Sequence, residues 1–177
     1  AIAPRAAARL LFATLPGIPL GIVLIVYAPA AWLRGGLGVL LIAYGAWSLT
    51  RPRLQQLPRR AARRALYACG FLAGVLGGAY NTNAPPLVLY GALAGWPPAR
   101  FRATLSGYFL FAACAICIGH ALSGLWTRHV FGLLAYALPV LAAGNLLGGW
   151  LARRIPHARF AALLHLLLIV LGALMLL

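Results

Sequence analysis

Residues 65–96 read ALYACGFLAGVLGGAYNTNAPPLVLYGALAGW. The first 16 and the last 10 of these residues are apolar, whereas a membrane-spanning helix needs about 20. The segment NTNAPP between them cannot continue a helix. Backbone groups freed at membrane depth are tolerated only where protein or a water-filled cavity covers them. Because many transporters build a substrate site where two short helices meet at a polar break, the stretch predicts part of a membrane transporter.

Composition favours the same class. The chain is 64% hydrophobic, against roughly 45–50% for soluble domains. Its net charge is +15, with no Asp or Glu. Such an excess of positive charge often indicates nucleic-acid binding. Here, however, all the charged residues are arginines, and they lie in short clusters between apolar runs, which is typical of the residues that flank membrane-spanning helices. The expected partner is therefore the lipid bilayer and not a nucleic acid.

The arginines also predict a topology. Apolar segments lie at 10–30, 36–49, 65–96, 103–122, 129–151 and 160–177. If 65–96 crosses the membrane once, the arginines divide 9 to 6 between the two sides; if it enters and returns, they divide 13 to 2. Cytoplasmic loops carry the excess of positive charge. We therefore expect a re-entrant helical hairpin that enters from the cytoplasm and returns to it.

Two pairs of segments align with each other. A shift of 123 residues pairs 10–30 with 129–151, including Leu-Pro at 15–16 and 138–139. A shift of 127 pairs 36–49 with 160–177, including Gly45 with Gly172. In the predicted topology the partners run in opposite directions, which is an inverted repeat of the kind found in many secondary transporters.

The repeat predicts a division of the chain. Residues 1–50 are the remainder of a first repeat with two transmembrane helices, 51–64 form a basic cytoplasmic loop, and 65–177 are a second repeat, in which three transmembrane helices follow the hairpin. Because the first repeat lacks its own hairpin, we expect the native protein to carry roughly 60 or more further residues before residue 1.

The run GFLAGVLGGAYNTNAPPLVLYGALAGWPPARFRATLSGYFLF, residues 70–111, resembles the C-terminal repeat signature of the sulfite exporter TauE/SafE family. PGIPLG at 16–21 and the closing apolar helix are also similar to that family. The family pattern often has glycines just before the proline, where this chain has Asn83-Ala84. The resemblance implies an all-α, multi-pass transporter of the bacterial inner membrane for sulfite, sulfonates and related small organic anions, with no enzymatic activity and no cofactor.

The break is the candidate substrate site, made of Asn81, Thr82, Asn83, Pro85, Pro86, Leu87 and Val88. Proline is favoured at the first positions of a helix, so the prolines are predicted to open the second half-helix. The first free N–H donors would then be those of Leu87 and Val88, at the positive end of a helix dipole, which favours anions. Asn83, with no N–H to cap, is free to contact a ligand. The alternative is that these groups satisfy one another and seal the hairpin tip.

Four further features near the break bear on the expected site and its surroundings. Ser106 is placed to reach the hairpin tip or to make a packing hydrogen bond, and Arg102 to attract anions at the cytoplasmic mouth or to flank the membrane. The end of the first half-helix near Gly77-Gly78 is expected to hold a coupling cation. The GxxxGxxxG face at 70–78 is expected to pack against 103–122 or against a missing repeat.

Two other classes of function stay open. A channel for small neutral solutes also uses paired half-helices, although the order here is Asn83-Ala84-Pro85 and not the Asn-Pro-Ala of aquaporins. A metal or redox protein would use Cys114 and Cys117, for which small apolar packing is the preferred interpretation. No metal site is expected, and a homo-oligomer is left open. The absence of carboxylates favours export, because an inside-negative potential drives an anion outward with about 2.3 kcal/mol per charge per 100 mV.

Single cysteines placed in loop 51–64 or in loop 97–102, in a background without native cysteines, test the topology. Both loops are expected to resist a membrane-impermeant thiol reagent in intact cells, because both face the cytoplasm. Labelling of one loop with protection of the other would show that the stretch 65–96 crosses the membrane once.

Overall fold

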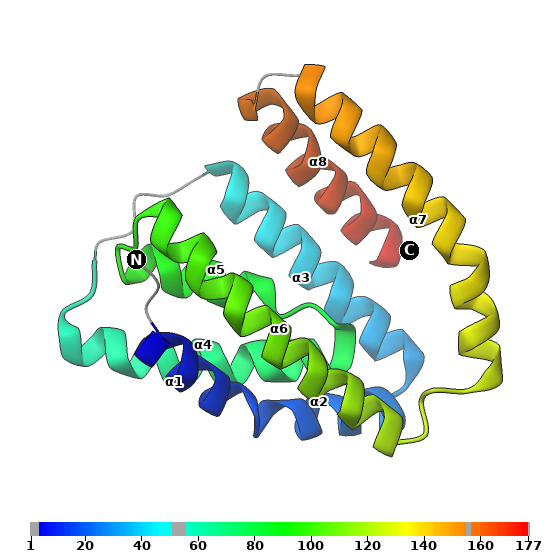
Figure 1. Ribbon diagram of the computed structural model, residues 1–177, viewed down its shortest axis with the longest axis horizontal. Coiled ribbons are helices and arrows are strands. Elements are labelled where there is room, and N and C mark those ends of the chain that lie inside the picture. Colours follow the sequence, from blue (N-terminus) through cyan, green and yellow to red (C-terminus); the bar gives the residue numbers. More distant parts are fainter. Residues whose placement is uncertain (1–3, 51–55, 155–156, 177) are drawn as a thin grey trace. The chain divides into compact units, whose positions relative to one another are not determined.

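The computed structural model describes residues 4–50, 56–154 and 157–176, and these residues form α-helices and no strand (Figure 1). The helices are α1 Pro4–Thr14, α2 Gly17–Tyr27, α3 Ala30–Thr50, α4 Arg59–Tyr80, α5 Ala84–Leu93, α6 Pro98–Leu122, α7 Arg128–Arg154 and α8 His157–Leu176. Within the described ranges, four helical stretches are long and apolar enough to cross a membrane: Ala6–Tyr27, Ala30–Thr50, Ala99–Leu122 and Arg128–Trp150. The predicted all-α membrane class is confirmed.

The helices gather into two compact units. Unit 1 comprises Ala1–Leu33 and Arg53–Ser123, and unit 2 comprises Arg34–Pro52 and Gly124–Leu177. Unit 1 therefore holds α1, α2, α4, α5 and α6, whereas α7, α8 and most of α3 belong to unit 2. The predicted repeats, 1–50 and 65–177, were defined by matches within the sequence and not by contacts between residues. That division stays a prediction.

Several helix limits differ from those expected. The apolar segment 10–30 is two helices and not one, because Pro16 lacks an N–H and its ring opposes continuation of α1. Helix α4 begins at Arg59, so the second half of the predicted loop 51–64 is helical. Helix α6 begins at Pro98, five residues before the expected 103. Helix α7 continues through Pro139, and the predicted break between α4 and α5 is present.

Unit 1 is built on a close crossing of glycine backbones. A Cβ added at Gly17 would lie 3.0 Å from the Cα of Gly74 and would collide with the carbonyl oxygen of Phe71. One added at Gly21 would lie 3.0 Å from the Cα of Gly78. The glycine face of α4 thus packs closely, as predicted, but its partner is α1–α2 and not segment 103–122.

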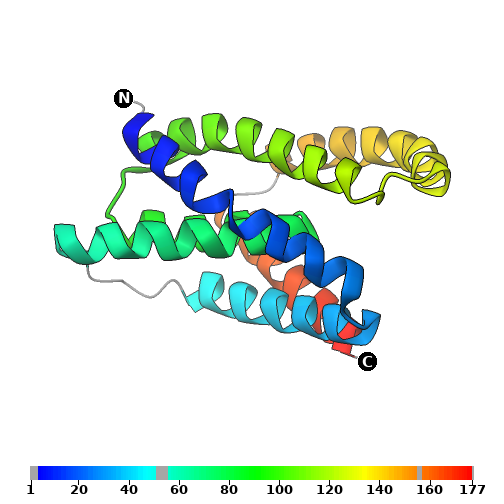
Figure 2. The same cartoon turned by 90° about the horizontal axis from the view of Figure 1, so that it is seen from below.

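Helices α1, α2 and α6 run in the same direction as α4. Along α4, Gly70 and Gly78 lie beside Thr14 and Gly21 of α1–α2, and Gly78 also contacts His120 near the end of α6. Figures 1 and 2 show α1, α2, α4 and α6 progressing from the same end of unit 1. Helix α5 returns to that end, where the Leu57 N–H donates to the Leu93 carbonyl at 3.0 Å.

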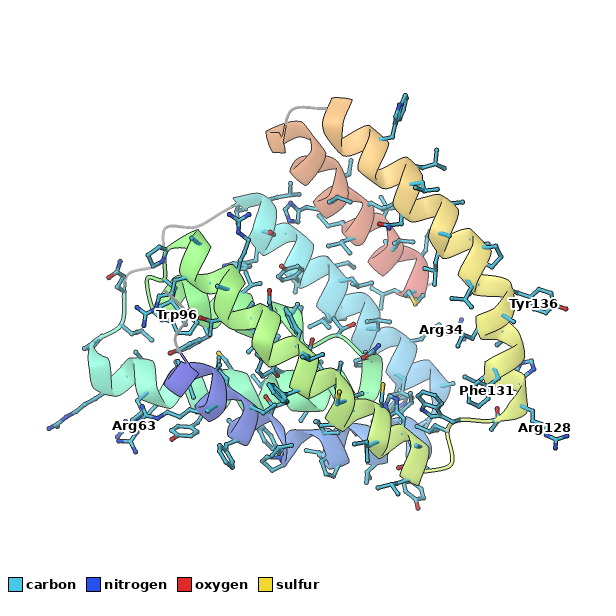
Figure 3. The ribbon with its side chains drawn as sticks, in the orientation of Figure 1. Arg34, Arg63, Trp96, Arg128, Phe131 and Tyr136 are labelled. Atoms are coloured by element: carbon cyan, nitrogen blue, oxygen red, sulfur yellow. The ribbon has the colours of Figure 1, made fainter. Side chains whose placement is uncertain are left out.

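Arginines collect at this shared end of unit 1. The described arginine side chains in the first two turns of α1, α4 and α6 are Arg9, Arg60, Arg63, Arg64, Arg100 and Arg102. Arg100 lies over the ring of Trp96, with 5.4 Å between the guanidinium carbon and the ring centroid, and Figure 3 shows Trp96 and Arg63 at this end. The arginines of these three helices therefore lie at one end of unit 1, while the re-entrant hairpin and the side of the membrane stay predictions.

A buried polar cluster joins three helices of unit 1. The hydroxyl oxygen of Thr14 lies 2.8 Å from the Leu10 carbonyl, 3.0 Å from the Gly70 carbonyl and 2.8 Å from the Tyr108 hydroxyl. Because carbonyls only accept, the Thr14 O–H donates to them and the Tyr108 O–H donates to Thr14. Both side chains are almost fully buried. The cluster therefore fixes the positions of α1, α4 and α6 along their axes relative to one another.

Unit 2 contains a second close helix crossing, between α3 and α8. A Cβ added at Gly45 would lie 2.8 Å from Cγ1 of Ile169, and one added at Gly172 would lie 2.8 Å from Cγ1 of Ile42. The shift of 127 residues pairs Gly45 with Gly172 and Ile42 with Ile169, so the two contacts are equivalent with the roles of α3 and α8 exchanged. Such an exchange is the signature of a twofold relation between two surfaces. It is consistent with the repeat at this crossing, while the inverted repeat of the whole chain stays a prediction.

Gly74→Ala tests the crossing in unit 1. The new methyl group would meet the Thr14 carbonyl oxygen and the Cα of Gly17, which belong to backbone and cannot turn aside. We expect a loss of about 1–3 kcal/mol or more in the free energy of unfolding, measured by thermal melting in detergent. The control is Gly107→Ala on α6, where nothing lies within 4 Å, and which should be neutral or stabilising by up to about 1 kcal/mol. Equal melting of the two variants would contradict the close approach.

Candidate functional site

The first half-helix ends in a turn that depends on Asn81. This residue has φ 53° and ψ 29° and is the only non-glycine residue with positive φ among those described. Its N–H donates to the Gly77 carbonyl at 2.9 Å, and the N–H of Thr82 donates to the Leu76 carbonyl at 3.2 Å. The first bond is the one that defines an αL cap, in which the left-handed position is usually Gly and sometimes Asn.

The second half-helix begins without a side-chain cap. Asn83 is the N-cap residue of α5 and makes no side-chain capping bond, as its position before two prolines predicts. The first four N–H positions of a helix have no intrahelical acceptor, and here they belong to Asn83, Ala84 and the prolines. The free donors are therefore those of Asn83 and Ala84. Those predicted, Leu87 and Val88, lie one turn further on, where helical acceptors exist.

Two amide side chains are left unbonded at the break. Asn81 is exposed and Asn83 is half-buried, and neither side chain has a hydrogen bond to any described residue. Thr82 differs, because its hydroxyl donates to the Tyr80 carbonyl at 3.0 Å. Pro86 and Leu87 are buried behind the break, and Pro85 and Val88 are half-buried. The described groups of the break therefore do not satisfy one another fully.

Helix α6 contributes one wall of the break. A Cβ added at Gly77 would lie 2.8 Å from Cδ1 of Ile116 and 3.4 Å from Cβ of Asn83. One turn further along α6, Nε2 of His120 lies 2.8 Å from the Gly78 carbonyl oxygen. The end of α4 where a coupling cation was expected is thus occupied by an imidazole. The sequence analysis did not assign His120 to the site, although an imidazole in the last turn of an apolar helix was a usable signal.

Ser106 and Arg102 are not brought to the break. Ser106 lies ten residues before Ile116 on α6, about 15 Å along the helix axis. Its hydroxyl donates to the Arg102 carbonyl at 3.0 Å, and both side chains are exposed. The prediction that Ser106 reaches the hairpin tip is therefore wrong, and its alternative, a local hydrogen bond, is what the structure contains.

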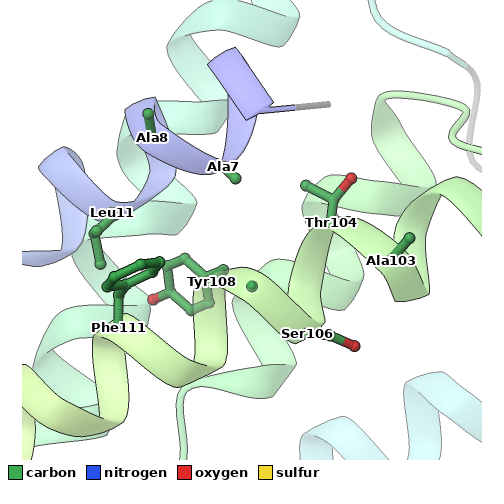
Figure 4. Close-up of a pocket in the computed structure, with 9 residues that line it drawn as sticks. Ala7, Ala8, Leu11, Ala103, Thr104, Ser106, Tyr108 and Phe111 are labelled. Carbon is green, nitrogen blue, oxygen red and sulfur yellow. The ribbon is translucent and has the colours of Figure 1, made fainter. Parts of the chain in front are cut away.

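Ser106 lines an apolar groove between α1 and α6, with a volume of about 530 Å³ (Figure 4). Leu11, Tyr108 and Phe111 contribute to its walls. A groove of this composition offers an anion little to bind. Cys114 and Cys117 lie exposed on α6, and the described residues contain no group of three His, Cys, Asp or Glu side chains able to hold a metal ion.

Comparison with known proteins places this arrangement in a family. A family model described as TauE, sulfite exporter TauE/SafE, matches residues 1–175. Curated proteins and solved structures give no match. The match spans both halves of the break and nearly all of the last helix, so the resemblance found in the sequence is confirmed.

Substitutions of Asn81 separate its backbone role from its amide. Asn81→Gly removes the amide but suits the left-handed backbone, so we expect stability to be unchanged or slightly higher. Asn81→Val places a β-branched residue at positive φ and is expected to lose about 1–2 kcal/mol or more. Thermal melting of both variants in detergent is the measurement. A Gly variant as unstable as the Val variant would mean that the Asn81 side chain, and not its backbone conformation, holds the turn.

Proposed function

Because the chain belongs to the sulfite exporter TauE/SafE family, we propose that it carries small sulfur-containing anions, such as sulfite or a sulfonate, across the bacterial inner membrane. The family is one of transporters, and its match together with four apolar helical spans makes this a multi-pass membrane protein. One observation carries the location of the site: the unbonded amides of Asn81 and Asn83 at the break between α4 and α5.

The groups at the break suit an oxyanion. Each asparagine amide offers two N–H donors without a formal charge. The N–H groups of Asn83 and Ala84 lie at the start of α5, where the helix dipole favours negative charge. The chain contains no Asp or Glu that would repel an anion. Neutral donors bind an anion without the strong ion pair that would slow its release.

Prolines keep these donors available. At the second and third positions of α5, Pro85 and Pro86 have no N–H for the Asn83 side chain to cap. Residues with N–H groups there would occupy the Asn83 oxygen and orient its amide toward the helix. In the proposed site Thr82 is a further hydroxyl contact, and Leu87 and Val88 form the apolar backing of the first turn.

The arginine end of unit 1 provides an entrance for anions. Arg102 is exposed among the other arginines of the first two turns of α1, α4 and α6, and such a cluster raises the local concentration of anions. Placed at the cytoplasmic face, it would draw substrate from the cell interior. The inside-negative potential then contributes about 2.3 kcal/mol per charge per 100 mV to outward movement. We therefore propose export as the direction.

Anion flux by the reconstituted, full-length protein tests the site. A lost hydrogen bond to a charged partner typically costs about 1.5–3 kcal/mol, so Asn83→Ala is expected to raise the half-saturating sulfite concentration roughly ten- to a hundredfold. Asn81→Gly should act in the same direction without loss of stability.

The control is Cys117→Ala, an exposed position on α6 that should leave flux nearly unchanged. Flux should also follow an imposed membrane potential. Voltage-independent passage of neutral solutes would favour a channel, and unchanged kinetics in both asparagine variants would remove the site from the break.

A further inference from the structure

The apolar groove between α1 and α6 starts near the arginine end of unit 1 (Figure 4). Along α6 it extends from Ala103 to Phe111, about 12 Å of helix axis. It is open to the outside of unit 1, because Phe111 is 61% exposed and a Cβ added at Gly107 would meet nothing within 4 Å. The groove therefore has room for a slender apolar group.

The groove ends about halfway along the helices. Beyond Leu11, the buried hydrogen bond between Thr14 and Tyr108 joins α1 to α6. A separate groove of about 420 Å³ lies further on, between α2 and α6. The hydrocarbon core of a bilayer is about 30 Å thick, so a groove of this length suits an acyl chain of one leaflet. A membrane-spanning helix would need an uninterrupted surface through both leaflets.

Arg100 lies on the face of α6 that lines the groove. It precedes Ala103 by three residues and Gly107 by seven, which is the spacing of one helix face. Helical side chains lean toward the start of their helix, so the exposed Arg100 side chain extends away from the apolar walls, toward the arginine end.

Aromatic rings lie beside this arginine. Arg100 lies over the ring of Trp96, and Trp96 packs edge to face against Tyr90, with 5.3 Å between the ring centroids. Tryptophan and tyrosine are enriched at the boundary between the hydrocarbon and the lipid head groups. The arginine end of the groove therefore has the composition expected at the level of the head groups.

Positive charge at this end comes from more than one helix. Arg9 of α1 and Arg100 of α6 both interact electrostatically with the Tyr90 hydroxyl. The chain has no Asp or Glu that would neutralise them. A phosphate at this end would meet guanidinium donors and no carboxylate.

From this geometry we infer that the groove between α1 and α6 binds an acyl chain of an anionic phospholipid, whose phosphate is held by Arg100 and the arginines near it. Basic pockets between membrane helices suit anionic head groups in general. The inference goes beyond the proposed function and does not depend on the break being the substrate site. A zwitterionic lipid with the same chains carries a cationic group beside its phosphate, so it should bind less tightly.

Native mass spectrometry of the full-length protein in detergent, titrated with phosphatidylglycerol or with phosphatidylcholine of the same acyl chains, tests the inference. We expect phosphatidylglycerol to bind more tightly. Arg100→Gln should weaken its binding roughly fivefold, which is the effect of one arginine near a membrane surface, and should change phosphatidylcholine binding little. Arg128→Gln, which removes an exposed arginine from α7, is the matched control and should bind both lipids like the wild type.

Gly107→Phe tests the apolar part of the site. The new ring would enter the groove, and its Cβ would meet no other group, so we expect a folded protein with weaker phosphatidylglycerol binding. The matched control is Gly132→Phe on α7, where an added Cβ is equally free, and which should keep the wild-type affinity. Thermal melting of both variants shows whether they are folded.

Equal binding of the two lipids by the wild type would overturn the inference, as would undiminished phosphatidylglycerol binding by folded Arg100→Gln or Gly107→Phe protein. Glycerol phosphate that binds as tightly as the lipid would mean that the arginines hold a free phosphate and the groove no chain. A dimer that is lost in Gly107→Phe while lipid binding stays would assign the groove to a second copy of the chain. These measurements contain no transport substrate, so their failure would leave the proposed function intact.

Discussion

The contact of α1–α2 with α4, backbone against backbone, is the constraint on which unit 1 depends. Gly17 and Gly21 approach Gly74 and Gly78 so closely that no Cβ fits between the helices. Without a hydrophobic driving force in lipid, such close packing is a principal source of helix association. The crossing runs to Gly78, the residue whose carbonyl receives His120. The packing that holds unit 1 together therefore also positions the end of α4, and with it the break.

The break itself combines one strained backbone position with a missing capping interaction. Asn81 adopts the left-handed conformation that ends α4, and the prolines of α5 prevent Asn83 from capping the next helix. Each feature alone is common at helix ends. Together they leave two amides without a hydrogen bond to any described residue, that of the exposed Asn81 and that of the half-buried Asn83. These available amides are the reason why we propose the break as the substrate site.

Within unit 1, charge and packing divide the helices into two ends. The described arginines of α1, α4 and α6 occupy the first two turns of these helices, whereas the break and His120 lie toward the last turns of α4 and α6. An anion attracted by the arginines would therefore have to travel along the helices to reach the amides. The buried Thr14–Tyr108 bond lies between the two levels and ties α1 to α6.

The sequence by itself determined the class, the break and the family, because apolar composition, Asn-Thr-Asn followed by two prolines, and the TauE/SafE motif are local properties of the chain. It also indicated that α1, α4 and α6 start at one end. The tertiary structure alone decided that the glycine face meets α2, that His120 and not Ser106 lies at the break, and that the N–H groups of Asn83 and Ala84 are the free donors. These outcomes depend on where each helix begins and on contacts between residues far apart in the chain, such as Gly78 with His120. The apolar pattern of a helix specifies that it is buried in lipid or protein, but not which neighbour it meets, because every apolar surface in a membrane is equally compatible with another.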